Sequence, residues 1–236
     1  RQTDNLGAAQ TAMNADFDNW MSTQTAAIAE AGGCSPTVTN NWDGTYIDFC
    51  LGGAITITWT IADICDTQTV NATYSITAVP DLTFNLPTNQ TVDACDFDDA
   101  TDNLSAAQTA LNADFDQWII DQTTAIAHAG GCSPQISNDF GGTYIDLCLG
   151  GALTITWTIE DICDTQTTSA TYTVNPVPDL TFNLPTDLSQ DACDFDDATD
   201  NLGAAQAAMN ADFDQWITDQ TTAIAHAGGC SPHISN

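Results

Sequence analysis

The chain has 236 residues, of which 32 are acidic and one is basic, and its formal net charge at pH 7 is −31. Nucleic-acid binding relies on Lys and Arg side chains that neutralise phosphates, so this charge excludes nucleic acid as a partner and disfavours contact with anionic membranes. No apolar run is long enough to span a bilayer, and we expect the secretion signal and the anchor to lie outside this stretch.

A motif that begins Asp-Asn-Leu divides the sequence into repeats. It occurs three times at a constant spacing of 98 residues, starting at Asp4, Asp102 and Asp200. A fixed period of this size is typical of a tandem array of domains, and we expect the chain to be a piece of a longer repetitive polypeptide. The predicted domains are repeat 1 at 1–79, which lacks its first strand, the complete repeat 2 at 80–177, and repeat 3 at 178–236, which lacks its C-terminal strands.

The complete repeat begins with extended segments and an acidic cluster. Leu82, Phe84 and Leu86 alternate with polar residues, as in a half-buried strand, and a second short segment reaches Cys95. The carboxylates that follow are hard oxygen ligands of the kind that Ca²⁺ takes, but carboxylates ahead of a helix are also favourable without an ion. We therefore expect no metal or cofactor and keep Ca²⁺ as a weak alternative, on Asp96, Asp98, Asp99 and Asp102.

A long amphipathic helix is predicted from Asp102 to Ala129, because Gly130 and Gly131 supply the left-handed residues that end helices. A break near Asn112 into two consecutive helices is the alternative, since Asn and Asp often cap a second helix. Apolar residues at three- and four-residue steps define one packing face of this helix. The face consists of Leu104, Leu111, Phe115, Trp118, Ile119 and Ile126.

Strands are predicted after the helix. Segment 135–138 is short, segment 144–148 leads to a glycine pair, and segment 152–160 alternates apolar residues with threonines. A last strand follows a turn at 164–166. The inward residues of the final two strands are Leu153, Ile155, Trp157, Ile159, Ala170, Tyr172 and Val174.

Short alternating strands with glycine and proline punctuation predict a mainly β fold with a helical insertion. We expect tandem immunoglobulin-like β-sandwich repeats, each with one long amphipathic helix or two short ones. Trp118 and Trp157 lie on faces that we expect to be buried, which favours core packing over sugar stacking. Trp42 lies in a turn and is expected to be more exposed.

Nine cysteines fall into four columns of the 98-residue repeat. An even set per complete repeat, without a CxxC metal spacing, indicates disulfides and an oxidising, extracellular setting, with a structural zinc site as the alternative. A domain of this size is marginally stable unless such bridges support it. The columns are Cys34/Cys132/Cys230, Cys50/Cys148, Cys65/Cys163 and Cys95/Cys193.

Histidine-based catalysis has little support. His128 and His226 share a position with Glu30, and His233 replaces Gln135. Because these residues differ between copies, a site present in every repeat cannot need them. No nucleophile-base-acid set, phosphate-binding glycine loop or metal-ligating histidine pair is visible, so we expect no enzyme activity.

Several motifs of the complete repeat together resemble a known family. They are an F-x-x-W helix, a GGC, a C-x-G-G, a strand of the form T-x-T-W-T-x-x-D-x-C, and a final T-Y-T-V strand. This combination is similar to the immunoglobulin-like repeats, related to hyalin repeats, of giant surface proteins of Bacteroidota. The turn at Asp161-Ile162-Cys163-Asp164 departs from the family's usual D-x-C-G-N but keeps the cysteine.

The resemblance, together with geometry, implies a disulfide pairing. It joins the two cysteines that flank the short hairpin after the helix, and it ties the first strand to the turn after the tryptophan strand. Four cysteines allow three connectivities, so other pairings stay open. The expected pairs are Cys34–Cys50, Cys132–Cys148 and Cys95–Cys163.

The family implies a role outside the cell. We expect a structural repeat in the shaft of a long adhesive filament on a bacterial surface, exported by the type IX pathway, as in gliding adhesins or grappling-hook filaments. The alternative is a multivalent glycan- or protein-binding adhesin module. Expected partners are neighbouring repeats, other chains of a multi-chain filament, and prey or surface glycans and proteins at ends outside this stretch. The helix either packs on its own domain or joins domains or chains.

Overall fold

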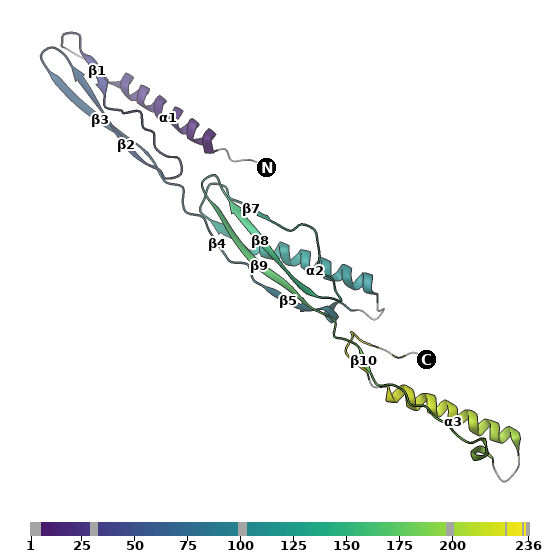
Figure 1. Cartoon of the computed structure of the whole chain (residues 1–236). Helices are drawn as coiled ribbons and strands as arrows, with labels where there is room; N and C mark the ends of the chain where they lie inside the picture. The colour runs from purple at the N-terminus through teal and green to yellow at the C-terminus, as the bar shows by residue number, and fades with distance from the viewer. Residues whose placement is uncertain are drawn as a thin grey trace. The chain divides into compact units, whose positions relative to one another are not determined.

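The computed structural model describes residues 6–28, 33–98, 103–196, 201–224, 226–232 and 234. These residues form a mixed α/β structure with three α-helices and eleven strands in four sheets (Figure 1). The chain divides into two compact units. The first contains residues 1–88, 120–141 and 155–170, and the second contains residues 89–119, 142–154 and 171–236.

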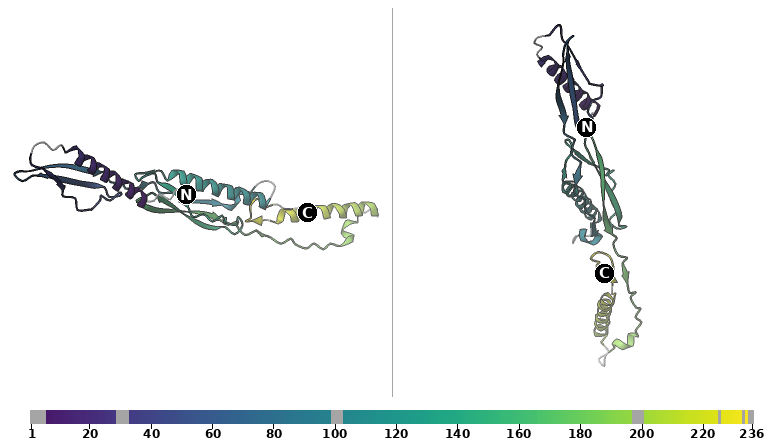
Figure 2. Two further views of the ribbon diagram at one scale, coloured as in Figure 1. Left: turned by 90° about the horizontal axis from the view of Figure 1, so that it is seen from above. Right: turned by 90° about the vertical axis from the view of Figure 1, so that its left-hand side faces the viewer.

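Repeat 1 lies wholly in the first unit and pairs one helix with one sheet. Helix α1 (Leu6–Ala27) is followed by strands β1 (Thr37–Asn40), β2 (Gly53–Ala62) and β3 (Thr67–Ile76), in the antiparallel order β1-β2-β3. Figure 2 shows α1 lying along these strands. Strands β2 and β3 pair over ten residues, from Gly53 opposite Ile76 to Ala62 opposite Thr67.

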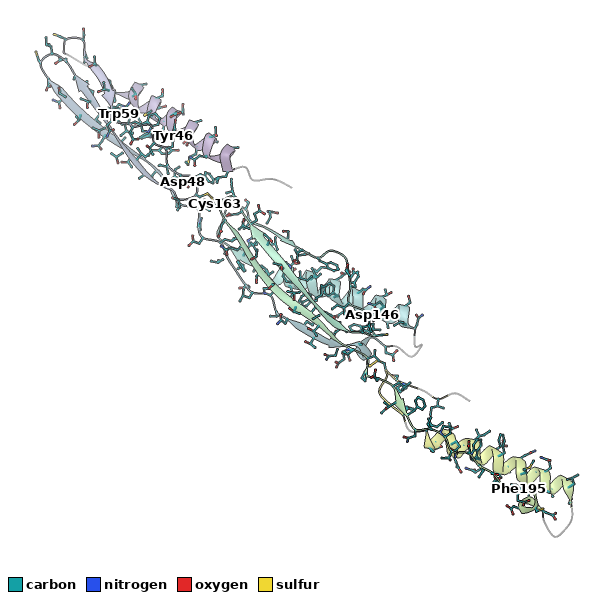
Figure 3. The ribbon with its side chains drawn as sticks, viewed as in Figure 1. Tyr46, Asp48, Trp59, Asp146, Cys163 and Phe195 are labelled. Atoms are coloured by element: carbon teal, nitrogen blue, oxygen red, sulfur yellow. A yellow bond between two sulfur atoms is a disulfide. The ribbon has the colours of Figure 1, made fainter. Side chains whose placement is uncertain are left out.

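Alternation along β2 builds the core of repeat 1. Ile57 and Trp59 are 1% exposed and point to one face of the sheet, where they meet Phe17 of α1, which is 2% exposed. The Phe17 ring lies 5.3 Å from the ring of Tyr74 and 5.8 Å from that of Tyr46, both in edge-on contact. Figure 3 shows Trp59 and Tyr46 between the helix and the strands. The layer that covers this sheet face is a helix, so the predicted β-sandwich is not confirmed.

The elements of repeat 2 include a helix and strands in the same order as in repeat 1, together with three more described strands and a 3₁₀ helix. They are β4 (Thr83–Phe84), β5 (Gln90–Asp93), the 3₁₀ helix η1 (Ala94–Phe97), α2 (Leu104–Ala125), β6 (His128–Ala129), β7 (Gln135–Asn138), β8 (Gly151–Glu160) and β9 (Thr165–Asn175). One sheet has the order β5-β9-β8-β7, and β4 pairs with β6 in a second sheet. Strand β5 runs parallel to the C-terminal part of β9, with Gln90 opposite Tyr172 and Asp93 opposite Asn175.

The predicted strand faces of repeat 2 are confirmed. Ile155, Trp157 and Ile159 of β8 are at most 1% exposed, and Ala170, Tyr172 and Val174 of β9 are at most 3% exposed. Leu153, at the start of the same face, is half-buried. Alternation of period two therefore identified the core of both strands.

Helix α2 is continuous, so the alternative of two shorter helices is wrong, and it ends at Ala125 rather than at Ala129. Residues His128 and Ala129 are extended instead, because they pair with Phe84 and Thr83. Gly130 and Gly131 do have positive φ angles, of 82° and 63°, but they turn the chain after β6.

Five of the six residues assigned to the helix packing face are buried. Leu111, Phe115, Trp118 and Ile119 lie on α2 and are 2–8% exposed, and Ile126 directly after the helix is 1% exposed. Leu104 is the exception, with 58% exposure, because it begins the helix beside an open hollow.

Repeat 3 contains β10 (Thr181–Phe182), the 3₁₀ helix η2 (Ala192–Phe195), α3 (Leu202–Ala223) and β11 (His226–Ala227). Strands β10 and β11 pair in the register of β4 and β6. Helix α3 has the same length as α1 and α2 but no fully buried residue. No described helix of the chain is long and apolar enough to cross a membrane.

Candidate functional site

The cysteines join successive repeats to one another. Cys50 of repeat 1 is bonded to Cys163 of repeat 2, with a Cα–Cα distance of 5.7 Å, and both belong to the first unit. Cys95 of repeat 2 is bonded to Cys230 of repeat 3, with a Cα–Cα distance of 5.1 Å, and both belong to the second unit. We call these two places junction 1–2 and junction 2–3. The disulfides fit the oxidising, extracellular type of environment that the sequence predicts.

The expected pairs Cys34–Cys50 and Cys132–Cys148 are not formed, and repeat 1 shows why. The backbone N–H of Cys34 donates to Asp63, which directly follows β2, whereas Cys50 lies just before β2. A strand of ten residues spans about 33 Å, so these cysteines lie at opposite ends of it, far beyond disulfide reach. Cys34, Cys132 and Cys148 have free thiols.

The expected pair Cys95–Cys163 is also wrong, for a related reason. Strand β5 is parallel to β9, so Cys95, two residues after β5, lies near the C-terminal end of β9. Cys163 lies just before the N-terminal end of the same eleven-residue strand. An antiparallel first strand would have placed the two cysteines together.

Junction 1–2 also holds the linker between repeats by backbone hydrogen bonds. The N–H of Val79 donates to the carbonyl of Cys50 at 3.0 Å, and the N–H of Gly131 donates to the carbonyl of Pro80 at 2.9 Å. A Cβ atom on Gly130 would lie 2.0 Å from the carbonyl oxygen of Asp81, so only glycine fits there. The glycine turn of the following repeat therefore holds the linker through a backbone hydrogen bond.

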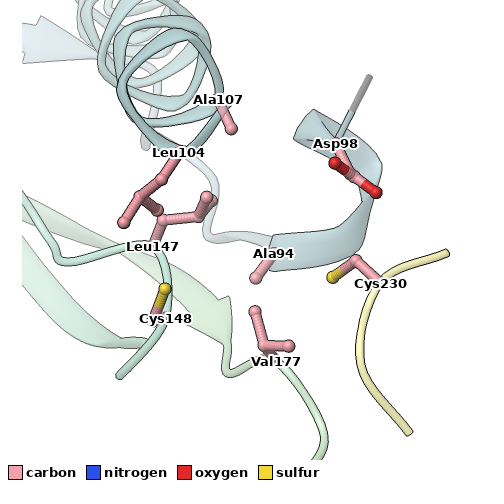
Figure 4. A pocket seen from close by; sticks show the side chains of 8 residues that line it. All are labelled: Ala94, Asp98, Leu104, Ala107, Leu147, Cys148, Val177 and Cys230. Carbon is pink, nitrogen blue, oxygen red and sulfur yellow. The ribbon is translucent and has the colours of Figure 1, made fainter. Parts of the chain in front are cut away.

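Junction 2–3 repeats this arrangement within the second unit. The N–H of Gly229 donates to the carbonyl of Pro178 at 2.8 Å, and a Cβ atom on Gly228 would lie 1.9 Å from the carbonyl oxygen of Asp179. Figure 4 shows an open, mostly apolar hollow beside this junction. Its lining residues are Ala94, Asp98, Leu104, Ala107, Leu147, Cys148, Val177 and Cys230.

In each of repeats 1 and 2, one aspartate accepts hydrogen bonds from the backbone of two cysteines. Asp161 accepts hydrogen bonds from the N–H groups of Cys132, Cys163 and Asp164 at 2.7–2.8 Å. Burial by itself raises the pKa of Asp161, but these three donors outweigh burial and hold the pKa below its ordinary value of 3.8. Asp63 receives the equivalent three N–H groups, which lower its pKa.

Tyrosine hydroxyls of the strands donate hydrogen bonds to aspartates of the helices. Tyr74 of β3 donates to Asp16 of α1 at 2.7 Å, and Tyr172 of β9 donates to Asp114 of α2. Burial first, and then the Asp16 carboxylate, raise the pKa of Tyr74 to about 12. The same causes raise the pKa of Tyr172. Both hydroxyls therefore stay protonated donors across the neutral range.

Three of the tryptophans, Trp59, Trp118 and Trp157, are buried in the core. Trp157 is fully buried and Trp118 is 3% exposed, as predicted for core residues. The indole N–H of Trp59 donates to the Thr25 hydroxyl at 2.9 Å, and that of Trp157 donates to the Thr123 hydroxyl at 2.8 Å. Trp42, expected to be exposed, is half-buried, with its ring 5.4 Å from that of Phe17.

Two of the four aspartates of the weak calcium candidate, Asp96 and Asp98, lie within the described residues. Asp99 and Asp102 lie outside the described residues. Asp96 accepts the N–H of Asp93 at 3.3 Å, and Asp98 has one buried carboxylate oxygen without a hydrogen-bond partner among the described residues. Within those residues, no group of three or more potential metal ligands gathers.

The two described histidines lie at equivalent positions of repeats 2 and 3. His128 and His226 lie in the short strands β6 and β11, beyond the ends of their helices. His233 and Glu30 lie outside the described residues. Within the described part of the chain, neither histidine belongs to a group of three or more potential metal ligands.

Sequence reasoning missed the pairing between repeats and the threonine partners of the tryptophans. A signal was present for the threonines, since Thr25, Thr123 and Thr221 recur at the 98-residue spacing. No protein-family model and no curated protein sequence matches the chain.

Proposed function

We propose that the chain is a structural repeat that carries tension in the shaft of a long extracellular adhesive filament on a bacterial surface. The observation that carries this proposal is that both disulfides connect one repeat to the next, rather than closing a single repeat. A disulfide within a domain stabilises only that domain. A disulfide between domains limits how far tension can separate them.

The two disulfides interleave along the chain, since Cys50 precedes Cys95 and Cys163 precedes Cys230. The shortest covalent path from one end to the other runs through Cys50 to Cys95 and then crosses to Cys230. Tension cannot extend the 135 residues that this second disulfide spans, which is roughly 450–490 Å of fully stretched chain. Unfolding under load therefore lengthens the oxidised chain far less than the reduced one.

The proposal also includes the finer predictions made from the sequence. The likeness to Bacteroidota surface repeats, type IX export, immunoglobulin-like topology and assembly into a multi-chain filament are all consistent with a tensile role. The net charge of −31 supports it further, because self-repulsion keeps a chain of repeats soluble and extended.

Single-molecule force spectroscopy tests the proposal. We expect the oxidised chain, pulled by its ends, to reach a contour length about 450–490 Å shorter than the reduced chain. The Cys230→Ser variant keeps only the 113-residue span of Cys50–Cys163, so it should extend further than the parent by roughly 70–80 Å. Cys163→Ser is the matched control, because the remaining 135-residue span leaves the limit unchanged. Equal lengths for oxidised and reduced chains would refute the tensile role.

The multivalent binding module is the other function that the sequence predicts. Of the tryptophans considered for sugar stacking, Trp118 and Trp157 are buried and Trp42 is half-buried. No observation favours it over the shaft. Binding of a common glycan by the chain on a glycan array would revive it.

A further inference from the structure

Helix α3 has the sequence pattern of α1 but lacks the strands that cover α1. Phe17 of α1 is 2% exposed, whereas Phe213 at the equivalent position of α3 is 56% exposed. Met209, equivalent to the buried Leu111, is 39% exposed. A helix face with this apolar content is normally buried against another element.

The polar groups that bind strands in repeat 1 recur on α3 without their partners. In repeat 1, Thr25 donates its hydroxyl to the carbonyl of Met21 and accepts the indole N–H of Trp59. Thr221 of α3 makes the same bond to the carbonyl of Ile217, at 2.8 Å, which leaves its oxygen aligned to accept an indole N–H. No indole N–H among the described residues donates to the Thr221 hydroxyl.

Two aspartates and a glutamine extend this match. Asp16 and Asp18 of α1 accept the hydroxyls of Tyr74 and Tyr46. Asp212 and Asp214 stand at the equivalent positions of α3, and no side chain among the described residues donates to their carboxylates. Gln10 holds the loop before β2 through the backbone of Ile47 and Phe49.

Among the described residues, the corresponding Gln206 bonds only to Asn210 on its own helix. Because its carbonyl oxygen and its second N–H are left over, Gln206 retains the groups with which Gln10 binds a loop. Helix α3 thus presents one glutamine, two aspartates and one threonine at the same spacing as the residues with which α1 binds the strands and loop of repeat 1.

Cys148 of repeat 2 supplies a second anchor point at junction 2–3. It is equivalent to Cys50, which is bonded to the turn cysteine Cys163 of the following repeat. In junction 1–2 that turn belongs to the hairpin whose Trp157 bonds to α2. One hairpin therefore covers the helix of its own repeat and bonds to the cysteine of the preceding one. At junction 2–3 both of these anchor points, α3 and Cys148, are open.

We propose that α3 and Cys148 together form a docking site for a strand segment with the sequence pattern of residues 134–175. Its tryptophan donates to Thr221, its two tyrosines donate to Asp212 and Asp214, and its turn cysteine bonds to Cys148. In that last step two thiols lose two electrons and two protons to a small-molecule disulfide, which becomes two thiols. The completed junction then holds two disulfides, Cys95–Cys230 and the new one.

The remaining free cysteines fit the same rule. Cys34 and Cys132 are equivalent to Cys230, Cys65 is equivalent to Cys163, and Cys193 is equivalent to Cys95. Ile64, beside the free Cys65, is 84% exposed, whereas the equivalent Ile162 beside the bonded Cys163 is half-buried. Burial of this turn therefore accompanies its bond to another repeat.

A segment carried on a soluble fusion protein tests the site. The probe has the sequence of residues 134–175 with Cys148→Ser, so that Cys163 is its one cysteine. It is mixed with the intact, oxidised chain in a glutathione redox buffer. We expect a 1:1 covalent adduct, with peptide mapping that places the bond between Cys148 of the chain and Cys163 of the probe. Amide exchange in α3 should slow at least tenfold.

Non-covalent affinity supplies a second measurement, with glutathione omitted. Thr221→Val removes the acceptor for the probe's indole and should weaken binding about fivefold. Thr222→Val is the matched control, because that hydroxyl is exposed and bonds only to Thr218. A soluble probe that leaves α3 exchange unchanged overturns the proposal, and so does an adduct distributed equally over all five free cysteines. Neither result depends on whether the chain bears tension, so the force measurement and this one fail separately.

Discussion

Helices α1 and α3 show what the strands contribute to a repeat. Both helices have 22 residues and share most of their sequence, and both form in full. Around α1, however, Phe17, Trp59 and Tyr74 belong to one core cluster, while the Phe213 ring contacts no described ring except that of Trp216 on its own helix. The helix thus forms from local signals, and the strands convert its apolar face into a core.

The largest difference between the two helices should appear when the phenylalanine is removed. We expect Phe17→Ala to lower the local free energy of unfolding in β2 and β3 by about 3–5 kcal/mol, because it leaves a cavity in a closed core. Phe213→Ala should change the stability of α3 by less than about 0.5 kcal/mol, since that ring is already exposed. Native-state hydrogen exchange measures both. Equal losses would show that α3 is covered in solution.

A smaller difference should follow from the threonine that accepts the tryptophan. Thr25→Val leaves the indole N–H of Trp59 without a partner and should cost about 1 kcal/mol, read from denaturant-dependent exchange in β2. Thr23→Val is the control, since Thr23 bonds only to the carbonyl of Asn19. An equal loss for both variants would assign the effect to helix propensity.

The smallest effect that we expect is a pH dependence present in repeats 1 and 2. The pKa of Asp63 and of Asp161 is lowered below 3.8 in the folded chain, so the contribution of the bonds to the N–H groups of Cys34 and Cys132 is present above the ordinary carboxyl pKa. Their contribution to stability is lost as the pH falls through the folded pKa values. Amide chemical shifts of Cys34 and Cys132 should titrate below pH 4. The amide of Cys230, which lacks this carboxylate among the described residues, should not titrate with them.

Local chemistry explains which parts of the fold were predictable. Alternation identified Ile155, Trp157 and Tyr172 as core residues, and helical spacing identified Phe115 and Trp118. These patterns depend only on neighbours in sequence. The helix end was missed because the pairing of His128 with Phe84 spans 44 residues and competes with helix continuation.

The disulfides were not predictable for a different reason. In a chain with a 98-residue period, a cysteine has the same sequence surroundings whether its partner lies in its own repeat or in the next. Only the parallel direction of β5 and the length of β2 separate the two cases, because they place the expected partners at opposite strand ends. Strand direction is a property of the folded sheet rather than of the spacing.

Interleaved disulfides also change how the chain responds to damage. A protease that cuts the backbone once between Cys50 and Cys95 leaves both fragments attached through Cys163. A cut between Cys163 and Cys230 leaves them attached through Cys95, and a cut between Cys95 and Cys163 is bridged in the same way. Any single break from Cys50 to Cys230 therefore leaves one covalent molecule, so an extracellular chain with this arrangement survives isolated cleavage without losing a segment.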